Sequence, residues 1–515
     1  MKTNNGDFTH DSTGNALLEF FSKAGSIFKK KESYYGGEKT VLELFKPAWV
    51  KNNYKAMQLS MWSRDIRGGA GNRGGFRDII AWLATVDSQW VEANLHMIPE
   101  VGRWDDLESL VGTICESSAL SFWVRAIRDG NGLAAKWAPR ADKNKEIFNK
   151  MRKIAGLDPK SWRKLIVKNT NVVETVMCSQ EWQNIDFNKV PSVAMARYNK
   201  AFKKHEPARF DEWKSALEKG VDEDGNAVKV NASVLFPHDV IRTLNTDTDS
   251  DKLANAQFAA LPNYMEGTDM RIMAICDFSG SMSVPVSGSV QAIDVSLGLG
   301  LYCSDKLGEK NPFYRKFIPF SNDSRLVDWR KETFSEAARN HNDGWCGSTN
   351  IGSALNKILE SAQMFNATND QIPNCLLILS DMQFDAGNRG GETSIETAMK
   401  VWEAAGYKRP KIVYWNLASY DGSPATKAHK DVALVSGFSP SVLKAVLGGT
   451  DFTPMAILER AIEKYKVIDP YKEKIKIEEV EITEEDVIMP KMRVEKGDKK
   501  LKAKGVSKKS RKVKK

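Results

Sequence analysis

The spacing of hydrophobic residues changes near the middle of the chain. From about residue 40 to residue 245 they recur three and four positions apart, as in Phe76, Ile79 and Leu83. That is the period of an amphipathic α-helix. In the second half, short continuous apolar runs alternate with helical segments, a pattern typical of buried parallel strands in βαβ units. The sequence therefore predicts a helical first part and an α/β second part.

The predicted elements and domains follow from this change. The strand-like runs are 271–276, 313–320, 375–380 and 411–417, and the helical ones are 290–307, 350–364, 392–405 and 440–465. A chain of 515 residues is too long for one ordinary core. We predict a frayed, variable N-terminal segment (1–40), a helical module (41–262), an α/β domain (263–470), an edge strand or linker (471–490) and a basic tail (491–515). The helical module shows no clean repeat, which favours a degenerate array of helix pairs.

The net charge of +9 is concentrated at one end of the chain. Residues 491–515 hold thirteen Lys or Arg and two acidic residues, so the remainder is close to neutral. Such a tail cannot bury a core, and we predict that it is disordered. It either attracts phosphate backbones in a salt-dependent way or serves only solubility.

Several classes of protein are disfavoured by the composition. No stretch approaches 18 consecutive apolar residues, and the polar N-terminus lacks the apolar core of a signal peptide. The six cysteines show no CxxC spacing, and three lie in or beside apolar runs, which favours reduced, buried thiols. We predict a cytoplasmic protein that does not engage a membrane.

Oxygen-bearing side chains follow two of the predicted buried strands. Asp277, Ser279 and Ser281 come after the first run, Asp381 follows the third, and Thr349 precedes a predicted helix. Loops at the carboxyl ends of parallel strands converge on one crevice. Carboxylates and hydroxyls without His or Cys suit Mg²⁺, with Mn²⁺ or Ca²⁺ as alternatives. The sequence predicts a divalent-metal site that retains an open position for a carboxylate or phosphate.

This segment resembles a known site. Asp277-Phe278-Ser279-Gly280-Ser281, with Thr349 and Ser380-Asp381, is similar to the metal-ion-dependent adhesion site of a von Willebrand factor A domain. The resemblance implies a doubly wound, Rossmann-like sheet and a divalent ion that bridges to a ligand. It also implies the metal ligands Asp277, Ser279, Ser281, Thr349 and Asp381. Ser348 departs from the usual Gly-Gly-Thr loop, which affects only the local turn.

Two other interpretations of the same residues remain open. Ser and Asp at strand-to-helix turns are ordinary helix N-caps. Asp277, with Asp381 and Asp385 on a later strand, also resembles a haloacid-dehalogenase phosphatase with Asp277 as nucleophile. That family requires a second Asp two positions on, and Ser279 cannot act as a general acid at neutral pH. A serine hydrolase is disfavoured because G-x-S-x-G is absent. We therefore predict a protein that is not an enzyme.

Residues 64–77 combine five glycines with four arginines. A G-x-G-x-x-G match lies inside this segment but does not follow a strand, so a dinucleotide loop is disfavoured. One interpretation is that the four arginines grip phosphates from an exposed loop, and the alternative is that Arg64 and Arg67 pair with Asp65, Asp78 or helix ends. The predicted nucleic-acid contacts are Arg64, Arg67 and Arg73, with Lys136, Arg140 and Lys143 from the segment 134–153. A solvated helix face is the alternative for the lysines. His238 and Trp137 are expected to be structural.

The same glycine-rich segment resembles the TROVE module (telomerase, Ro and vault proteins). Further segments that match this module lie at 101–107, 136–139, 190–192 and 237–240. They resemble the plant, fungal and viral relatives especially. The resemblance covers roughly residues 40–465, and the order of helical module and A domain is that of Ro proteins. It implies a HEAT-like ring of stacked helix pairs that binds non-coding RNA, with structured RNA outside and a single-stranded end in the hole.

The predicted function is therefore that of a monomeric, Ro-like RNA-binding protein of a ribonucleoprotein, with a metal adhesion site. The alternative is a metal-dependent protein-interaction module that binds no RNA, whose site accepts a carboxylate from a protein ligand.

Overall fold

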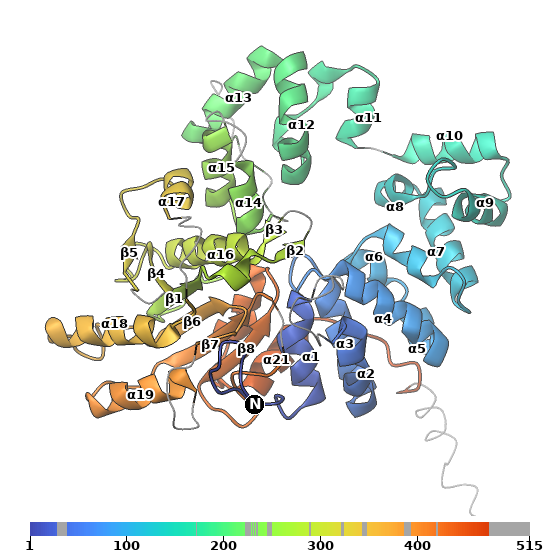
Figure 1. Cartoon of the computed structure of the whole chain (residues 1–515). Helices are drawn as coiled ribbons and strands as arrows, with labels where there is room; N and C mark the ends of the chain where they lie inside the picture. Colours follow the sequence, from blue (N-terminus) through green and yellow to red (C-terminus); the bar gives the residue numbers. More distant parts are fainter. Residues whose placement is uncertain are drawn as a thin grey trace, which may run out of the picture. The chain divides into compact units, whose positions relative to one another are not determined.

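The computed structural model describes residues 1–27, 39–170, 172–221, 228, 230, 232, 235–244, 250–287, 290–320, 324–341, 348–385, 393–418 and 421–472 (Figure 1). Its contacts divide the chain into a compact unit, Met1–Ile468, and a second unit, Asp469–Lys515. The predicted basic tail and all but the first two residues of the predicted linker 471–490 lie outside the described residues. The predicted domain limits within the first unit stay predictions.

The first part of the chain is helical, as the hydrophobic spacing predicts. Its helices are α1 Ala16–Lys23, α2 Val41–Lys51, α3 Asn53–Arg64, α4 Arg73–Val86, α5 Ser88–Ala93, α6 Met97–Val101, α7 Glu116–Arg128, α8 Gly132–Trp137, α9 Lys145–Ile154, α10 Pro159–Asn169, α11 Val173–Cys178, α12 Ser192–His205, α13 Pro207–Lys219, α14 Pro237–Thr243 and α15 Ser250–Ala259. Neighbours such as α2 and α3, or α12 and α13, pack as pairs. The HEAT-like ring itself stays a prediction.

Local sequence explains where several of these helices begin. Thr40 forms a capping box with Glu43 at the start of α2, and Asn52 and Asn72 cap α3 and α4 with their side-chain oxygens. Large aromatic residues then fill the space between the helices, including the buried Trp62. Around α12 and α13 a separate cluster of buried hydrophobic residues forms.

The second part is an open sheet with strand order β5-β4-β1-β6-β7-β8. The strands are β1 Ile272–Asp277, β4 Lys316–Phe320, β5 Val327–Asp328, β6 Cys375–Ser380, β7 Lys411–Asn416 and β8 Val432–Ser436. All neighbours pair in parallel except β4 and β5. A small hairpin, β2 Pro285–Ser287 and β3 Val290–Gln291, follows β1. The predicted mostly parallel sheet is confirmed.

Helices cover this sheet on two sides. They are α16 Ala292–Lys306, α17 Phe334–Asn340, α18 Ile351–Met364, α19 Ser394–Ala404, α20 Leu443–Leu447 and α21 Pro454–Ile462. Figure 1 shows α16 on one face and α18 and α19 on the other. The chain passes from β1 to β4 in one direction and then returns to β6 on the other side of β1. The strand order therefore reverses between β1 and β6, which is where ligands bind in open α/β sheets.

The structure departs from the predicted elements of the second part at two places. The helix predicted over 440–465 is divided into α20 and α21. Gly448 and Gly449 end the first helix, and Thr453 caps the second, which begins at Pro454. The short strand β8 was not predicted, because a run of four apolar residues (432–435) carries no periodicity that separates a buried strand from a helix.

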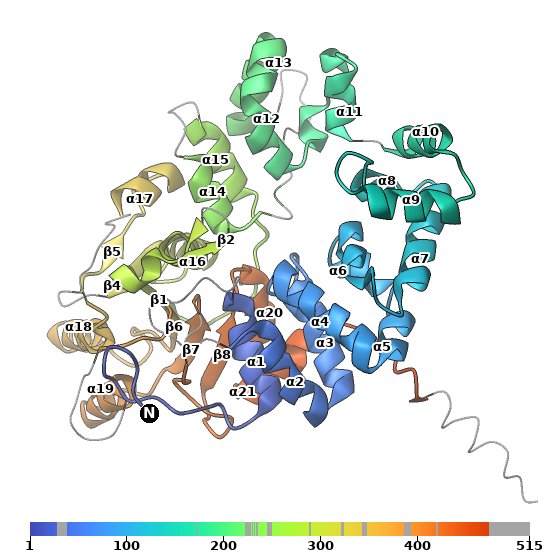
Figure 2. The same ribbon diagram turned by 45° about the vertical axis from the view of Figure 1, so that its right-hand side comes forward.

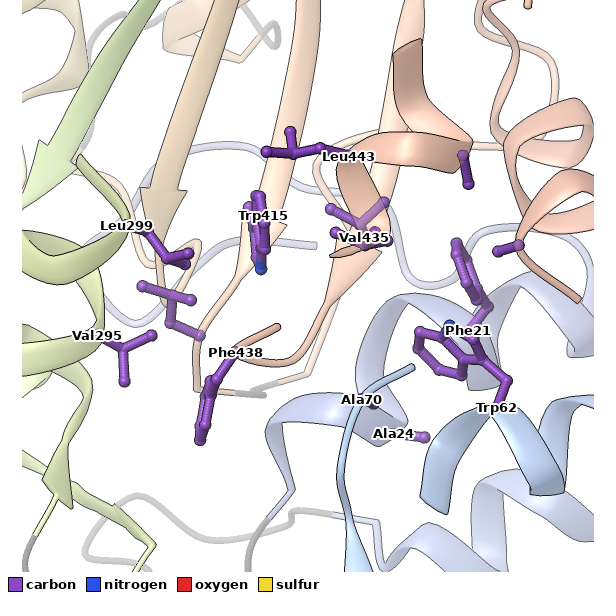
Figure 3. Close-up of a cluster of buried hydrophobic side chains, with 14 of the residues drawn as sticks. Phe21, Ala24, Trp62, Ala70, Val295, Leu299, Trp415, Val435, Phe438 and Leu443 are labelled. Atoms are coloured by element: carbon purple, nitrogen blue, oxygen red, sulfur yellow. The ribbon is translucent and has the colours of Figure 1, made fainter. Parts of the chain in front are cut away.

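The first helix of the chain is packed against the last strand of the sheet. Phe21 and Trp62 have ring centroids 4.5 Å apart, and Figure 3 shows them beside Val435 of β8. The Ser436 hydroxyl donates to Phe21 O at 2.8 Å. A side chain at Gly25 would come within 2.8 Å of the backbone around Gly437, so glycine permits this close approach.

The prediction of a frayed N-terminal segment is wrong for residues 1–27. This segment forms hydrogen bonds to residues far along the chain, such as Thr3 to Phe384 O and His10 to Ser423 O. Polar composition suggested fraying, but here the polar groups are used in pairing with loops at the sheet edge. None of the helices in the described ranges has the length and apolar character needed to cross a membrane.

Candidate metal site and arginine cluster

Two carboxylates lie at the ends of neighbouring strands where the strand order reverses. Asp277 ends β1, and Asp381 directly follows Ser380, the last residue of β6. The pairing register places Cys276 opposite Leu379, so the two strands end at the same level. Asp277 is 0% exposed and Asp381 is 1% exposed. The sheet thus buries two acidic side chains at its carboxyl edge.

Both oxygens of Asp277 accept hydrogen bonds. The Ser279 N–H donates to Oδ1 at 2.9 Å, and the Ser380 hydroxyl donates to Oδ2 at 2.6 Å. The hydroxyls of Ser279 and Ser281 lie 3.0 Å apart. Four of the five predicted metal ligands therefore belong to two neighbouring loops at this edge.

Asp381 has an unusual environment for a buried carboxylate. Its Oδ1 accepts the Gln383 N–H at 3.0 Å, but its buried Oδ2 has no hydrogen-bond partner among the described residues. The next residue, Met382, adopts a left-handed backbone with φ of 65°. Left-handed conformations are strained for a residue other than glycine and concentrate at functional sites. An unpartnered buried charge is costly, and a cation beside it would remove that cost.

Burial raises the proton affinity of both carboxylates. Burial, together with the negative charge of Asp381, raises the pKa of Asp277 to about 7, although the Ser380 and Ser279 hydrogen bonds act in the opposite direction. Burial likewise raises the pKa of Asp381, opposed in part by Ser281. Burial is the largest cause of both shifts, because it removes water from the charged form. A divalent ion would reverse both.

The fifth predicted ligand, Thr349, has other partners. Its N–H and hydroxyl donate to Asp385 at 2.8 and 3.1 Å, and its hydroxyl oxygen accepts the Asn5 amide at 2.7 Å. Within the described residues, no hydrogen bond joins Thr349 to the other four predicted ligands. Asp385 was noted in the sequence only for the phosphatase interpretation. No sequence signal pointed to Asn5, which lies 344 positions before Thr349.

The interpretation of these residues as helix caps is wrong. Ser279 makes no side-chain cap hydrogen bond to the short 3₁₀-helix Gly280–Ser283. Helix α18 is capped by Asn350, not by Thr349. Among the described residues, no three His, Cys, Asp or Glu side chains form a metal-binding group. The candidate site therefore depends on two carboxylates supplemented by hydroxyls.

A second polar site surrounds Asp106 in the helical part. This side chain is 0% exposed and accepts hydrogen bonds from Arg64 Nε at 2.7 Å, Arg73 Nε at 3.1 Å and Arg77 Nε at 2.7 Å. The backbone N–H of Arg103 also donates to it. Although burial acts to raise it, the charge of Arg64 and the Arg77 hydrogen bond hold the pKa of Asp106 below its usual value.

The arginines thus form one cluster with the motif Trp104-Asp105-Asp106. Arg73 and Arg103 also pair with Asp105. A side chain at Gly102 would come 2.5 Å from Asp106 Oδ2, so glycine is required for the arginine to approach. The alternative prediction, that Arg64 pairs with an acidic residue, is confirmed, but the partner is Asp106 and not Asp65 or Asp78. The sequence could not choose between acidic residues near in sequence and those near only in space.

The predicted nucleic-acid residues differ in exposure. The Arg64 side chain is 4% exposed and held by Asp106, so the prediction that it contacts phosphate is wrong. The Arg73 and Arg103 side chains are 39% and 33% exposed. Their cluster of four guanidinium groups around two carboxylates keeps an excess of positive charge, which half-buried Glu108 offsets in part.

The remaining predicted contacts lie elsewhere. Arg67 and Lys143 are exposed, Arg140 is half-buried, and Lys136 lies 3.6 Å from Glu174. These residues stay predictions.

Trp137 and His238 have structural surroundings. The Arg103 guanidinium stacks over the Trp137 ring at 3.8 Å, and the ring is half-buried rather than in the core. His238 is buried between Phe236 and Phe438, with ring centroids 5.3 and 5.6 Å away. Burial lowers the pKa of His238, so it is held neutral.

The fold is that of an open α/β sheet with a reversal of strand order, preceded by paired helices. Residues 271–492 match a family model described as a domain of unknown function (DUF7788), and residues 3–126 and 159–267 match another domain of unknown function (DUF2828). The chain is similar to the uncharacterized protein L728 of Acanthamoeba polyphaga mimivirus, at 24% identity over 91% of this chain and 88% of that protein. The crystal structure of the Deinococcus radiodurans Ro (RSR) protein aligns with a TM-score of 0.42 and 13% identity, over 88% of this chain and all of that one. A likeness of that size assigns no function by itself.

Proposed function

We propose that this chain is a non-catalytic, Ro-like binding protein that holds a divalent ion at the carboxyl edge of its sheet and RNA on its helical part. The observation that carries the metal proposal is the buried, unpartnered Oδ2 of Asp381 beside the buried Asp277. Asp277, Ser279, Ser281, Thr349 and Asp381 would hold the ion. Oxygen ligands of this type favour Mg²⁺, with Mn²⁺ or Ca²⁺ as substitutes.

The ion would supply a positive charge that accepts a carboxylate or phosphate from a partner. Only two of the five proposed ligands are charged, so a divalent ion would not be over-neutralised. Asp277 is oriented by its two hydrogen bonds, and Asp381 Oδ2 is free of such bonds to the described residues. The hydroxyls of Ser279 and Ser281 would complete the oxygen set on the same loop.

The proposed RNA surface is the exposed side of the arginine cluster. The hydrogen bonds of Arg73, Arg77 and Arg103 to residues 105 and 106 use their Nε and Nη2 atoms, which leaves the Nη1 donors outside these bonds. Guanidinium groups with free donors recognise phosphates, and a cation stacked on Trp137 adds an aromatic face. The resemblance to the TROVE module supports RNA as the partner.

A phosphatase is disfavoured by the residue two positions after Asp277. The position of the general acid is Ser279, whose hydroxyl faces Ser281. We therefore propose no reaction at this site.

Metal binding is tested by isothermal titration of the full chain with Mn²⁺. Asp381→Asn is expected to weaken binding by about tenfold or more, since it removes one of two charged ligands. Asp328→Asn, an exposed carboxylate paired with Arg330, is the matched control and leaves binding unchanged. Equal Mn²⁺ affinity in all three proteins would contradict the metal proposal.

RNA binding is tested separately by a gel shift with structured and single-stranded RNA at low and high salt. The affinity is expected to fall steeply as salt rises. Absence of binding at low salt would contradict the RNA proposal and leave the metal-dependent protein-interaction module as the alternative.

A further inference from the structure

The segment that precedes α1 runs along the edge that carries the candidate metal site. In Figure 2 it passes beside α19 before it reaches α1. The Thr3 hydroxyl donates to Phe384 O at 2.8 Å, and the Asn4 N–H donates to the Gln383 side chain at 2.8 Å. Gly6 forms an isolated antiparallel bridge with Asp385. The first residues of the chain thus pair with the loop that follows Asp381.

Asn5 lies directly against a proposed metal ligand. Its side-chain amide donates both to the Thr349 hydroxyl and to Gln383 O, each at 2.7 Å. Thr349 is buried, whereas Asn5 itself is exposed to solvent. The edge at Thr349 is therefore covered from outside by a residue of the same chain.

The second half of the segment pairs in the manner of an added strand. The N–H of His10 donates to Ser423 O at 3.0 Å, and the N–H of Ser423 donates to His10 O at 2.9 Å. Between these two bridges, both carboxylate oxygens of Asp7 accept the Ser394 N–H at the start of α19. Main-chain pairing combined with side-chain anchors is a recurring way to bind extended peptides.

The segment is attached differently from the helix that follows it. Leu18, Phe20 and Phe21 of α1 are completely buried, but no hydrophobic residue of 1–12 belongs to the buried core. Gly14, with φ of +74°, and the N-cap Asn15 mark the junction. Thr3 and Asp7 are buried, and so are their hydrogen bonds to Phe384 O and the Ser394 N–H. The segment is nevertheless held by polar contacts alone, each of which contributes little, so residues 3–10 can leave the edge while α1 stays in place.

We infer that the sheet edge carries a peptide-docking surface, formed by Thr349, residues 383–385 and residues 421–427. Residues 3–10 of the same chain occupy this surface. Its external ligand is an extended peptide with a carboxylate at the position of Asn5. The inference rests on the proposed metal site. Asparagine has the shape of aspartate but no charge, and its amide donates to Thr349 and to Gln383 O instead of binding a cation. A carboxylate cannot donate to Gln383 O, so its binding here depends on the ion. A carboxylate there would join the ion as a ligand supplied by the partner.

The test uses the full chain and a variant in which residues 3–10 are replaced by a Gly/Ser segment of equal length. The probes are fluorescent peptides with the sequence of residues 1–12, either unchanged or carrying Asn5→Asp. The variant is expected to bind both peptides, and the unaltered chain to bind them at least about tenfold more weakly, because its own segment competes intramolecularly. Mn²⁺ in place of EDTA is expected to strengthen binding of the Asn5→Asp peptide alone.

A single substitution provides a second measurement that does not depend on the replaced segment. Asn5→Ala removes the contacts with Thr349 and Gln383 and is expected to raise peptide affinity. Asn4→Ala is the matched control, since Asn4 contacts Gln383 through its backbone N–H. Melting temperatures of both variants confirm that the fold is unchanged.

Three results would overturn the inference, and they are distinguishable. Equal peptide affinity in the unaltered and replaced chains shows that residues 3–10 do not compete for the surface. Peptide binding that ignores Mn²⁺, in a chain that binds Mn²⁺ by calorimetry, refutes the carboxylate ligand and leaves the metal site standing. Absence of Mn²⁺ binding in every chain refutes the proposed metal site, and the inference with it.

Discussion

Arg64 and Asp106, 42 positions apart in sequence, form a buried ion pair with 2.7 Å between Nε and Oδ2. Breaking a buried pair leaves the remaining charge without compensation. We expect Arg64→Leu to lower the free energy of unfolding by about 3 kcal/mol, since Arg73 and Arg77 still reach Asp106. Urea denaturation measures this change. Arg330→Leu, which breaks an exposed pair, is the control and should change stability by less than about 1 kcal/mol.

The buried pair of Asp277 and Asp381 predicts opposite effects of one substitution with and without metal. In EDTA, Asp381→Asn removes a buried charge that repels Asp277, so the variant should melt at a higher temperature, with a gain of about 1–3 kcal/mol. In millimolar Mg²⁺ the unaltered chain should gain stability and the variant should not. Melting temperatures of the unaltered chain and the variant, measured in EDTA and in Mg²⁺, test both expectations. An equal shift with Mg²⁺ in both proteins would contradict the site.

His238 predicts a loss of stability in acid. Burial lowers its folded pKa below the ordinary value of 6.5, so the unfolded chain binds the proton more readily. The stability due to neutral His238 is therefore complete above pH 6.5 and is lost as the pH falls through the folded pKa. We expect the difference in melting temperature between His238→Gln and the unaltered chain to narrow as the pH falls below 6.5. Comparison of the two proteins cancels the other titrating groups, including Asp277. A constant difference from pH 5 to pH 8 would contradict this expectation.

The contact between Arg103 and Trp137 predicts how RNA binding should respond to mutation. Arg103→Ala removes one half-buried guanidinium and should reduce the dependence of affinity on salt by about one counterion. Trp137→Leu should weaken binding of single-stranded RNA by about 1–3 kcal/mol through lost stacking. Gel shifts over a salt series measure both effects. Arg330→Ala is the control, since Arg330 lies in the α/β part. Equal losses in Arg103→Ala and Arg330→Ala, with no loss in Trp137→Leu, would show that only net charge matters.

The hydrophobic pattern was sufficient to predict the parallel sheet and most of its helices. The strand 375–380 and the helix 350–364 were predicted within one residue, because buried strands and amphipathic helices leave a local signal. Asp277 and Asp381 were placed at one sheet edge for a similar reason, since parallel strands deliver their carboxyl ends together. The prediction of one continuous helix over 440–465 was wrong, because two glycines and a proline divide it although the apolar spacing continues.

The sequence by itself determined the class of fold and the residue types at the sheet edge, because both depend on short-range periodicity. Only the tertiary structure decided which polar side chains pair with one another. Arg64 is matched with Asp106 and not with the adjacent Asp65, and Thr349 with Asp385 and Asn5, because long-range packing sets which polar groups meet. Composition predicted a frayed start of the chain. The structure instead pairs that start with the edge of the sheet, since its hydrogen-bonding groups find partners that lie more than 340 residues away.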